Sequence, residues 1–283
     1  MVIRRANLRI DAENMQIEVL SRDKDSIRFL LKGVSPAFSN ALRRAMIAEV
    51  PTMAIEDVMI IENSSVLYDE ILSHRLGLVP LTTDLDSYVL PEECSCKSEL
   101  GCNRCRATLS LEAEATDESR YVYSGEMKPE NPEVKPVSDT IPIAKLAPGQ
   151  RIKLEAYAKL GRGAEHAKWQ PVSSAAYKYL PKLSIDPKKC NGCAECVKFC
   201  PKSILAIKNG KVTVEREIDC SLCRECERRC PQKPPAIRVG WDVSTFVFAV
   251  ESTGALPPAR IVKEAARILS KKAIEMRKIL EEG

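Results

Sequence analysis

A repeat of cysteines constrains this chain more than any other feature of its sequence. The pattern C-x2-C-x2-C-x3-C-P occurs twice, thirty residues apart, at Cys190, Cys193, Cys196 and Cys200 and then at Cys220, Cys223, Cys226 and Cys230. Cysteines that serve only as small core residues are scattered along a chain, so this clustering indicates metal ligands or disulfides. Two-residue spacers let three thiolates hold one face of an iron–sulfur cube, and the fourth cysteine of each copy then reaches the other cube.

The spacing therefore predicts two crossed ligand sets. Cluster 1 takes Cys190, Cys193, Cys196 and Cys230, and cluster 2 takes Cys220, Cys223, Cys226 and Cys200. Apolar runs at 204–207 and 212–214 flank Asn209-Gly210 and predict a β-hairpin between the two copies. Residues 186–236 resemble bacterial-type ferredoxins that hold two 4Fe–4S clusters, so we expect one or two such clusters in this chain. Disulfides, a zinc site, loss of one cluster, or loss of one iron to give a 3Fe–4S cluster remain alternatives.

The other four cysteines form a second, shorter group. Cys94, Cys96, Cys102 and Cys105 follow the pattern C-x-C-x5-C-x2-C. Four thiolates on one short loop can close a tetrahedral zinc site. Disulfides or free thiols are the alternatives to zinc.

Composition excludes several classes of protein. Of 283 residues, 45% are hydrophobic and 29% charged, the balance of a globular chain with two or three domains. No apolar run approaches the roughly 18 residues of a membrane helix, and the N-terminus lacks the apolar core of a secretory signal, so we expect a cytoplasmic chain that binds no membrane.

The net charge of +4 does not by itself indicate a nucleic-acid binder. His74 and His166 are the only histidines, no catalytic motif surrounds them, and we expect no catalytic residues.

Hydrophobic periodicity predicts an α+β fold. We expect a hairpin from strands at 15–20 and 27–31, a helix from Ser35-Pro36 to Pro51, and a second helix at 67–76 with Ile71, Leu72 and Leu76 inward. Further strands are expected at 55–61, 107–113, 154–160 and 246–250, and a proline-punctuated loop at 128–149.

The chain ends in a long predicted helix at 257–282. One apolar stripe runs along it through Val262, Ala265, Leu269, Ala273, Met276 and Leu280. At 1.5 Å per residue this helix is about 39 Å long, which exceeds one small domain. The stripe therefore packs on the chain's own core alone, or on that core and a partner chain, and both interpretations stay open.

Five segments carry a resemblance to a known family. They are Phe38–Met46 (FSNALRRAM), Val50–Asp57, Tyr68–Leu81, Val250–Arg260 and Glu264–Leu269. Together they resemble the assembly subunit of multisubunit RNA polymerases. With its ferredoxin-like insert the chain is most similar to the archaeal form of that subunit, a relative of the bacterial α subunit N-terminal region. The resemblance covers nearly the whole chain.

The resemblance implies three domains. They are a discontinuous dimerisation domain of residues 1–51, 172–185 and 237–283, a mostly β insert domain of residues 52–171 with the four-cysteine loop, and the ferredoxin-like domain at 186–236. Eukaryotic relatives carry a zinc loop near the position of residues 94–105.

The resemblance also implies partners. In this family the helices near both chain ends pair with a smaller α-like subunit, L, which would involve Phe38, Leu42, Val262, Leu269 and Met276. Asn40, Arg43 and Arg44 would face a large catalytic subunit, and subunits N and P would join the pair. The chain would thus be a non-catalytic scaffold of a DNA-directed RNA polymerase, a nucleotidyltransferase, and would meet DNA only through the complex.

An electron-transfer protein is the main alternative. Redox ferredoxins are often acidic, whereas residues 186–238 contain 12 Lys and Arg against 7 Asp and Glu, a net charge of 12 − 7 = +5. No flavin or nucleotide fingerprint is present. A segment of about 50 residues with eight thiolates has little core of its own, so cluster formation would fold it. A structural or assembly-regulating role of the clusters is therefore favoured.

A stand-alone nucleic-acid-binding protein is less favoured, because only 5% of residues are aromatic and aromatic side chains on which bases could stack are scarce.

Overall fold

The computed structural model describes residues 15–98 and 101–282, which fall into two compact units. Among the described residues, the first unit contains Met15–Ser21, Arg28–Asn40 and Ala176–Ala249. The second contains Arg22–Ile27, Ala41–Ala175 and the chain from Val250 onward. Predictions for residues 1–14, including the start of the dimerisation domain, lie outside the described residues.

Strands dominate the described part of the chain. The strands are β1 (Gln16–Arg22), β2 (Ser26–Lys32), β3 (Thr52–Asn63), β4 (Arg106–Glu114), β5 (Arg120–Tyr123), β6 (Lys128–Pro129), β7 (Pro142–Leu146), β8 (Arg151–Gly161), β9 (Val172–Ile185), β10 (Leu205–Lys208), β11 (Lys211–Val214) and β12 (Ile237–Ser252). The α-helices are α1 (Pro36–Ala48), α2 (Asp69–Gly77), α3 (Glu195–Lys198), α4 (Glu225–Arg228) and α5 (Pro258–Glu282). Short 3-10 turns occupy Pro91–Glu93, Ser124–Glu126, Ala167–Trp169 and Glu217–Asp219. None of the helices in these two ranges is long and apolar enough to cross a membrane.

The first sheet has the strand order β1-β2-β12-β9, which brings together strands from both ends of the chain. Its core is aromatic: Phe29 and Phe248 stack with ring centroids 5.0 Å apart and an interplanar angle of 3°. Tyr177 adds an edge-to-face contact with Phe246. The predicted hairpin at the start of this sheet is confirmed, although every residue of β1 is exposed.

The predicted helix after Ser35 is also confirmed. The Oγ of Ser35 accepts a hydrogen bond from the backbone N–H of Phe38 at 3.2 Å, which satisfies one of the free donors at the start of α1. The helix ends at Ala48, before Pro51.

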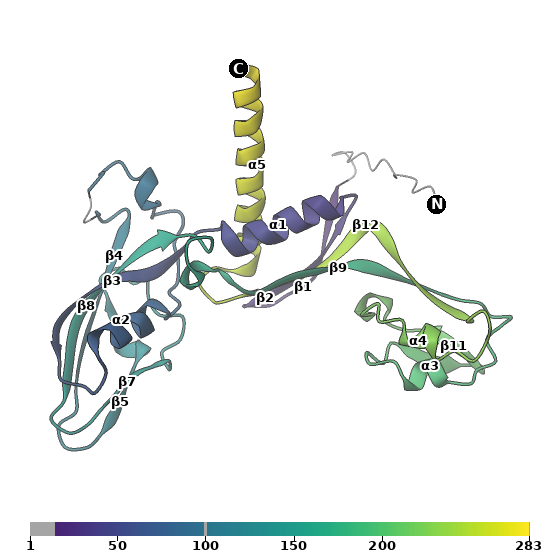
Figure 1. Ribbon diagram of the computed structural model, residues 1–283, viewed down its shortest axis with the longest axis horizontal. Helices are drawn as coiled ribbons and strands as arrows, with labels where there is room; N and C mark the ends of the chain where they lie inside the picture. The colour runs from purple at the N-terminus through teal and green to yellow at the C-terminus, as the bar shows by residue number, and fades with distance from the viewer. Residues whose placement is uncertain (1–14, 99–100, 283) are drawn as a thin grey trace. The chain divides into compact units, whose positions relative to one another are not determined.

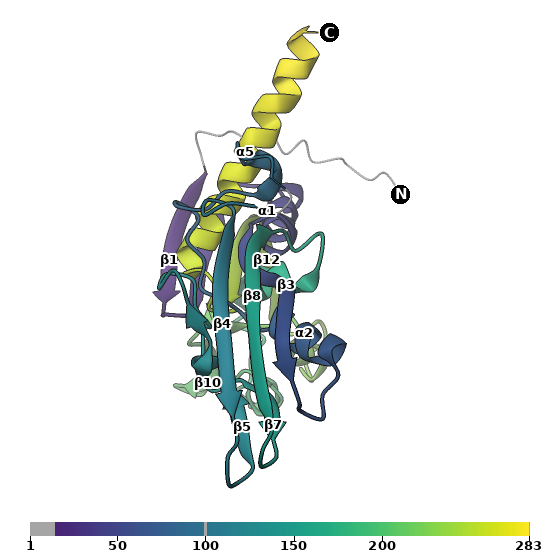
Figure 2. The ribbon, with the colours of Figure 1, turned by 90° about the vertical axis from the view of Figure 1, so that its left-hand side faces the viewer.

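The second sheet has the order β3-β8-β4-β6, and its residues contribute to the main core of the second unit. Figure 2 shows β4, β8 and β3 side by side. Alternate residues of β8 are buried, as the sequence predicts, and β8 pairs antiparallel with both β3 and β4. Helix α2 packs beside β3 and buries Leu72 and Leu76 completely. The prediction that Ile71 faces inward is wrong, since 49% of Ile71 is exposed. Adjacent helix residues point about 100° apart, so a nine-residue helix that buries Leu72 turns Ile71 away.

The proline-rich segment 128–149 is not only a loop. It contains β6, which pairs with β4, and β7, which pairs with β5. Pro142 is the first residue of β7 and Pro129 lies in the edge strand β6, two positions where a missing backbone N–H costs little. Burial of Ile143, Ala144 and Leu146 in the core stabilises a strand here, although the prolines of the segment favour turns.

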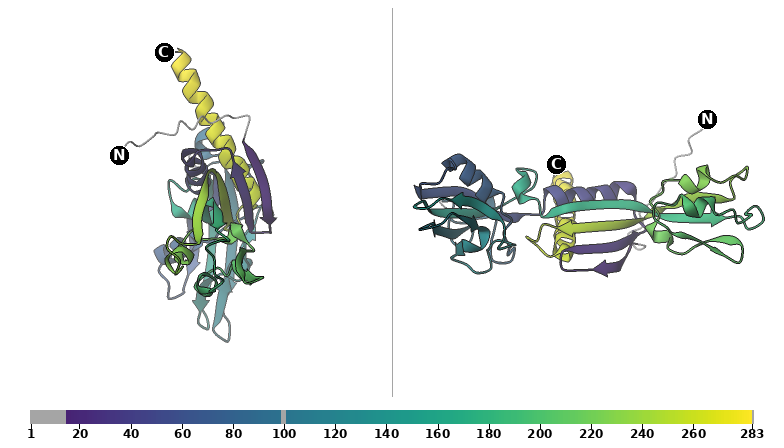
Figure 3. Two further views of the ribbon diagram at one scale, coloured as in Figure 1. Left: turned by 90° about the vertical axis from the view of Figure 1, so that its right-hand side faces the viewer. Right: turned by 90° about the horizontal axis from the view of Figure 1, so that it is seen from below.

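The cysteine repeat folds into a small lobe, residues 186–236, which we call the cysteine lobe. It lies at the ends of β9 and β12, and all of it belongs to the first unit (Figure 1). Strands β10 and β11 form the predicted hairpin, with Asn209 and Gly210 at positive φ (52° and 70°) in its turn. Helices α3 and α4 have four residues each. Figure 3 shows them in green, together with this hairpin, at the end of the long strands.

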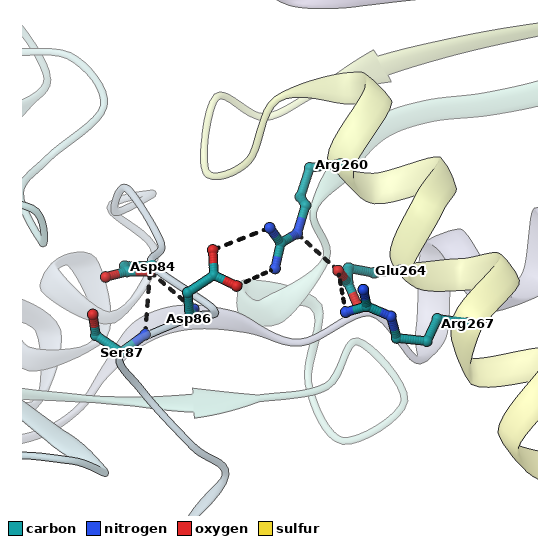
Figure 4. Close-up of polar contacts among 6 residues, drawn as sticks. All are labelled: Asp84, Asp86, Ser87, Arg260, Glu264 and Arg267. Carbon is teal, nitrogen blue, oxygen red and sulfur yellow. Dashed lines mark hydrogen bonds and ion pairs between the residues drawn. The ribbon is translucent and has the colours of Figure 1, made fainter.

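A network of charged side chains fixes the start of α5 within the second unit (Figure 4). Arg260 donates to both oxygens of Asp86, at 3.1 Å and 2.7 Å. Glu264 is buried and accepts from Arg267, and it also pairs with Arg260. The hydrogen bond from Arg260 lowers the pKa of Asp86. The first turns of α5 are therefore held in one orientation relative to the loop that contains Asp84 and Asp86.

Candidate iron–sulfur, metal and partner-binding sites

The first cysteine pocket is lined by Cys190, Cys193, Cys196 and Cys230. Apolar side chains of Ile185, Val212 and Ile237 complete its wall. Asn191 fixes the loop between the first two cysteines, because its Oδ1 accepts from the backbone N–H of Cys193 at 3.2 Å. Gly192 has φ of +72°, and a Cβ there would lie 2.1 Å from the carbonyl oxygen of Gly210. Only glycine fits where this loop meets the β10–β11 turn.

The second cysteine pocket is lined by Cys200, Cys220, Cys223 and Cys226. Leu183, Ile204, Leu205 and Val239 surround it. Backbone N–H groups point at sulfur in both pockets: Leu222 donates to Cys220 Sγ at 3.4 Å, and Ala236 donates to Cys230 Sγ at 3.3 Å. The structure thus gathers the same two sets of four cysteines that the crossed assignment predicts, and it places donors that suit negatively charged thiolates.

Three of these thiols are buried inside the cysteine lobe. Burial raises the pKa values of Cys196 and Cys220, and it raises that of Cys226 to about 12. Such thiols stay protonated near neutral pH unless a cation replaces the proton. A metal or cluster that binds in these pockets would displace such protons, and its binding would stabilise the folded lobe.

The four cysteines at 94–105 come together in the second unit. Their sulfur atoms all lie within 4.8 Å of one another. Cys94 Sγ and Cys102 Sγ are 3.7 Å apart, Cys96 Sγ and Cys105 Sγ 3.8 Å, and Cys102 Sγ and Cys105 Sγ 3.9 Å. A disulfide needs about 2.05 Å. Four sulfurs at about 2.3 Å from one zinc ion would be about 3.8 Å apart, so the spacing fits a tetrahedral metal site.

Within this loop the thiols of Cys102 and Cys105 have very different pKa values. A hydrogen bond from the backbone N–H of Arg104 lowers the pKa of Cys102 to about 7. Burial raises the pKa of Cys105 to about 12. The backbone N–H of Cys102 also donates to Cys105 Sγ at 3.2 Å. A metal ion would bind Cys102 readily and would have to displace a proton from Cys105.

The predicted partner-binding residues differ in exposure. On α1, Arg44 is exposed, Phe38, Asn40 and Arg43 are half-buried, and Leu42 is only 4% exposed. Leu42 therefore already packs inside this chain.

On α5 the apolar stripe changes along its length. Ile261 and Ala265 are fully buried, Val262 and Leu269 are half-buried, and every residue from Ser270 to Glu282 is exposed. In the last turns Met276 is 65% exposed, Ile279 70% and Leu280 71%, and the three share one side of the helix. Ile279 is missing from the predicted stripe, although its position three residues after Met276 could have identified it.

His166 has a structural place in the second unit. Its Nδ1 accepts from the backbone N–H of Lys168 at 3.1 Å and caps the turn at Ala167–Trp169. His74 is an exposed residue of α2. Neither histidine needs a catalytic role to explain its position.

Comparison with family models matches two segments of the chain. Residues 58–182 match the family described as the RNA polymerase Rpb3/RpoA insert domain. Residues 189–234 match the family described as the 4Fe-4S dicluster domain. The second match covers all eight repeated cysteines, and iron–sulfur binding by this segment agrees with its two cysteine pockets.

Several curated proteins resemble nearly the full chain. DNA-directed RNA polymerase subunit Rpo3 of Archaeoglobus fulgidus is 46% identical over 267 residues, which is 94% of this chain and 98% of that protein. The Rpo3 of Methanosphaera stadtmanae is 43% identical over 92% of this chain and 96% of its own length. The Rpo3 of Pyrococcus horikoshii is 43% identical over 92% and 95%.

Proposed function

This chain belongs to the family of the archaeal DNA-directed RNA polymerase subunit Rpo3, and we propose that it assembles that enzyme by pairing with a smaller α-like subunit, L. The chain is a non-catalytic subunit of a nucleotidyltransferase complex. Pairing with L would use α1 and α5, the two long helices near the chain ends. The pair would then recruit subunits N and P and the large catalytic subunits, and would meet DNA only through them.

One observation carries this proposal. The stripe on α5 is fully buried at Ile261 and Ala265 but about two-thirds exposed at Met276 and Leu280. A continuous apolar stripe that extends beyond the part covered by the chain's own core is typical of a helix that packs on a second chain. Val262 lies beside the fully buried Ile261 and is half-buried, and Leu269 is half-buried between the covered and the uncovered turns.

Residues of α1 supply the second part of the proposal. We assign Phe38 and Leu42 to the L side, where the buried Leu42 supports the helix from within. We assign Asn40, Arg43 and Arg44 to a large catalytic subunit, since Arg44 is exposed and a guanidinium suits carboxylates on a partner surface. Arg44→Ala should then weaken recruitment of the large subunit and leave the pair with L unchanged in size-exclusion chromatography.

The three-domain division remains our proposal. The dimerisation domain would contain residues 1–51, 172–185 and 237–283, the insert domain residues 52–171, and the ferredoxin-like domain residues 186–236. The two family matches, at 58–182 and 189–234, support the insert and ferredoxin-like parts.

We assign one 4Fe–4S cluster to each cysteine pocket. Cluster 1 would be held by Cys190, Cys193, Cys196 and Cys230, and cluster 2 by Cys200, Cys220, Cys223 and Cys226. The eight cysteines lie in two groups of four beside backbone N–H donors, which supports this assignment. A bound 3Fe–4S cluster in one pocket is the competing assignment, and anaerobic iron and sulfide analysis with an EPR spectrum distinguishes the two.

The clusters are proposed to stabilise the cysteine lobe rather than to carry electrons. Most of the lobe's buried residues are cysteines or line the cysteine pockets, so the lobe depends on the clusters for its core. Chelation of iron should therefore unfold the lobe and weaken binding of large subunits while the pair with L survives. If Cys220→Ser with Cys223→Ser left polymerase assembly unchanged, the assembly role would be wrong and electron transfer would become the better proposal.

The loop at 94–105 is proposed to bind one zinc ion through Cys94, Cys96, Cys102 and Cys105. The sulfur separations of 3.7–3.9 Å support a metal over disulfides. Zinc analysis of the purified chain, together with a free-thiol titration, tests this part independently of the iron–sulfur clusters.

A further inference from the structure

Lys178 of β9 reaches the main chain that leads into the second cysteine pocket. Its Nζ donates to the carbonyl oxygen of Ile218 at 2.7 Å and to that of Cys220 at 2.7 Å. The side chain is half-buried, so this ammonium group is partly removed from water. A lysine in such a place carries its charge only where nearby oxygens or negative groups stabilise it.

Three other contacts hold the same segment on the strands of the first sheet. Arg28 of β2 pairs with Asp219, with Nη2 and Oδ1 3.3 Å apart. The carboxylates of Glu217 and Glu227 accept from the backbone N–H groups of Leu183 in β9 and Val239 in β12. The segment that supplies Cys220, Cys223 and Cys226 is thus tied to β2, β9 and β12 by side chains.

The cysteine repeat provides an internal comparison. Thirty residues earlier, Lys188 and Cys190 occupy the positions of Ile218 and Cys220. Within residues 15–98 and 101–282, no ammonium group donates to the carbonyl oxygens of these two residues. Main-chain bonds occur in both halves, from Cys190 N–H to Asp186 O at 3.0 Å in the first and from Cys220 N–H to Glu217 O at 3.0 Å in the second. The two halves therefore differ in this cation, and also in the contacts of Arg28, Glu217 and Glu227, which the first half lacks at the corresponding positions Lys189, Pro187 and Val197.

We propose that Lys178 is a positioning residue for cluster 2, which fixes the backbone that carries Cys220 and offsets the negative charge of the cluster. The inference rests on the proposed assignment of Cys200, Cys220, Cys223 and Cys226 to that cluster. An oxidised 4Fe–4S cluster with four thiolates carries a net charge of about −2, and net charge and hydrogen bonding set its reduction potential. A nearby ammonium stabilises the more negative, reduced form, so Lys178 raises the potential of cluster 2 selectively.

The test uses the full chain, reconstituted anaerobically, with Lys178→Met and Lys178→Arg. Lys182→Met is the matched control, because Lys182 lies four residues further along β9 and pairs with Asp242 instead. Iron release to a chelator and EPR-monitored redox titration are measured for each chain. In Lys178→Met we expect one cluster to lose iron about tenfold faster, the scale typical of lost outer-shell contacts to a metal site. The midpoint potential of that cluster should become more negative, whereas Lys178→Arg and Lys182→Met should behave like the parent chain.

Two further chains assign the effect to a pocket. In a Cys193→Ser background, which removes a cluster 1 ligand, the Lys178→Met effect should persist, and in a Cys223→Ser background it should vanish. The proposal is overturned if Lys178→Met leaves both release and potential unchanged, if Lys182→Met causes the same change, or if the effect follows cluster 1. If the parent chain forms no cluster that depends on Cys223, the proposed cluster assignment itself has failed, which is a different result.

Discussion

The last three turns of α5 allow a quantitative test of the pairing proposal. Met276, Ile279 and Leu280 are 65%, 70% and 71% exposed in the isolated chain and share one face of the helix. Complete burial of such a side chain stabilises by about 1.5–3 kcal/mol, of which the Cβ retained in alanine keeps about 0.8 kcal/mol. With roughly two-thirds of each side chain still to be buried, each change to alanine should cost about 1 kcal/mol of binding to L.

The expected losses are large enough to measure by analytical ultracentrifugation. Ile279→Ala alone should weaken the pair about fivefold, and Met276→Ala, Ile279→Ala and Leu280→Ala together about 100-fold. Alanine favours helix, and all three side chains are exposed, so the thermal unfolding of the isolated chain should not change.

Ile274 provides a control of the same residue type on the same helix. It is 57% exposed, but two residues before Met276 it points about 160° away from the stripe. Ile274→Ala should therefore leave the affinity for L unchanged. The reasoning is refuted if Ile274→Ala and Ile279→Ala weaken the pair equally, or if the triple change has no effect on it.

Three other predictions concern the metal sites and pH. Cys105→Ser should abolish one bound zinc per chain in elemental analysis without reducing iron content, because Cys105 belongs only to the 94–105 group. Gly192→Ala should lower iron content by about one cluster, since its Cβ would lie 2.1 Å from the carbonyl oxygen of Gly210. Gly210→Ala is the control, because Gly210 has a similar positive φ but open space around it, and this variant should retain both clusters. Equal iron loss in the two variants would contradict the steric argument. Hydrogen bonding from Lys182 lowers the pKa of Asp242 from 3.8 to about 2, so this carboxylate stabilises the fold above about pH 4 and loses that contribution as pH falls toward 2. Because Lys182 is 63% exposed, the contribution is at most about 1 kcal/mol, and the stability gap between the parent chain and Asp242→Asn in denaturant titrations should narrow from pH 7 to pH 2.

Local signals in the sequence predicted most of the elements correctly. Ser35 and Pro51 bounded α1, the Asn209-Gly210 pair marked the β10–β11 hairpin, and three- and four-residue spacing identified α5. In the cysteine pockets, two-residue spacers place three cysteines of each predicted set on one short loop, while Cys200 and Cys230 come from the other copy of the repeat. These features depend on backbone geometry over a few residues, which the sequence encodes directly.

Features that depend on distant contacts were missed or left open. The strand at Pro142–Leu146 was not predicted, because the prolines of segment 128–149 indicate a loop and the pairing of this strand with β5 depends on residues roughly twenty positions earlier. The direction of Ile71 depended on how α2 packs against β3. The spacing of the four cysteines at 94–105 left zinc and disulfides open, and the sulfur separations on which our zinc proposal rests cannot be obtained from spacing alone.

The sequence by itself predicted two groups of four cysteines in the cysteine lobe, the helices near both chain ends and the family, because each depends on short-range spacing or on contiguous motifs. The assignment of the two cysteine groups to clusters stays our proposal. Only the tertiary structure decided which turns of α5 remain uncovered, and that Lys178 contacts residues 40 and 42 positions away at Ile218 and Cys220. Burial and long-range hydrogen bonds depend on how strands are registered and how helices lie on sheets. That arrangement is a property of the whole fold and cannot be read from any short segment.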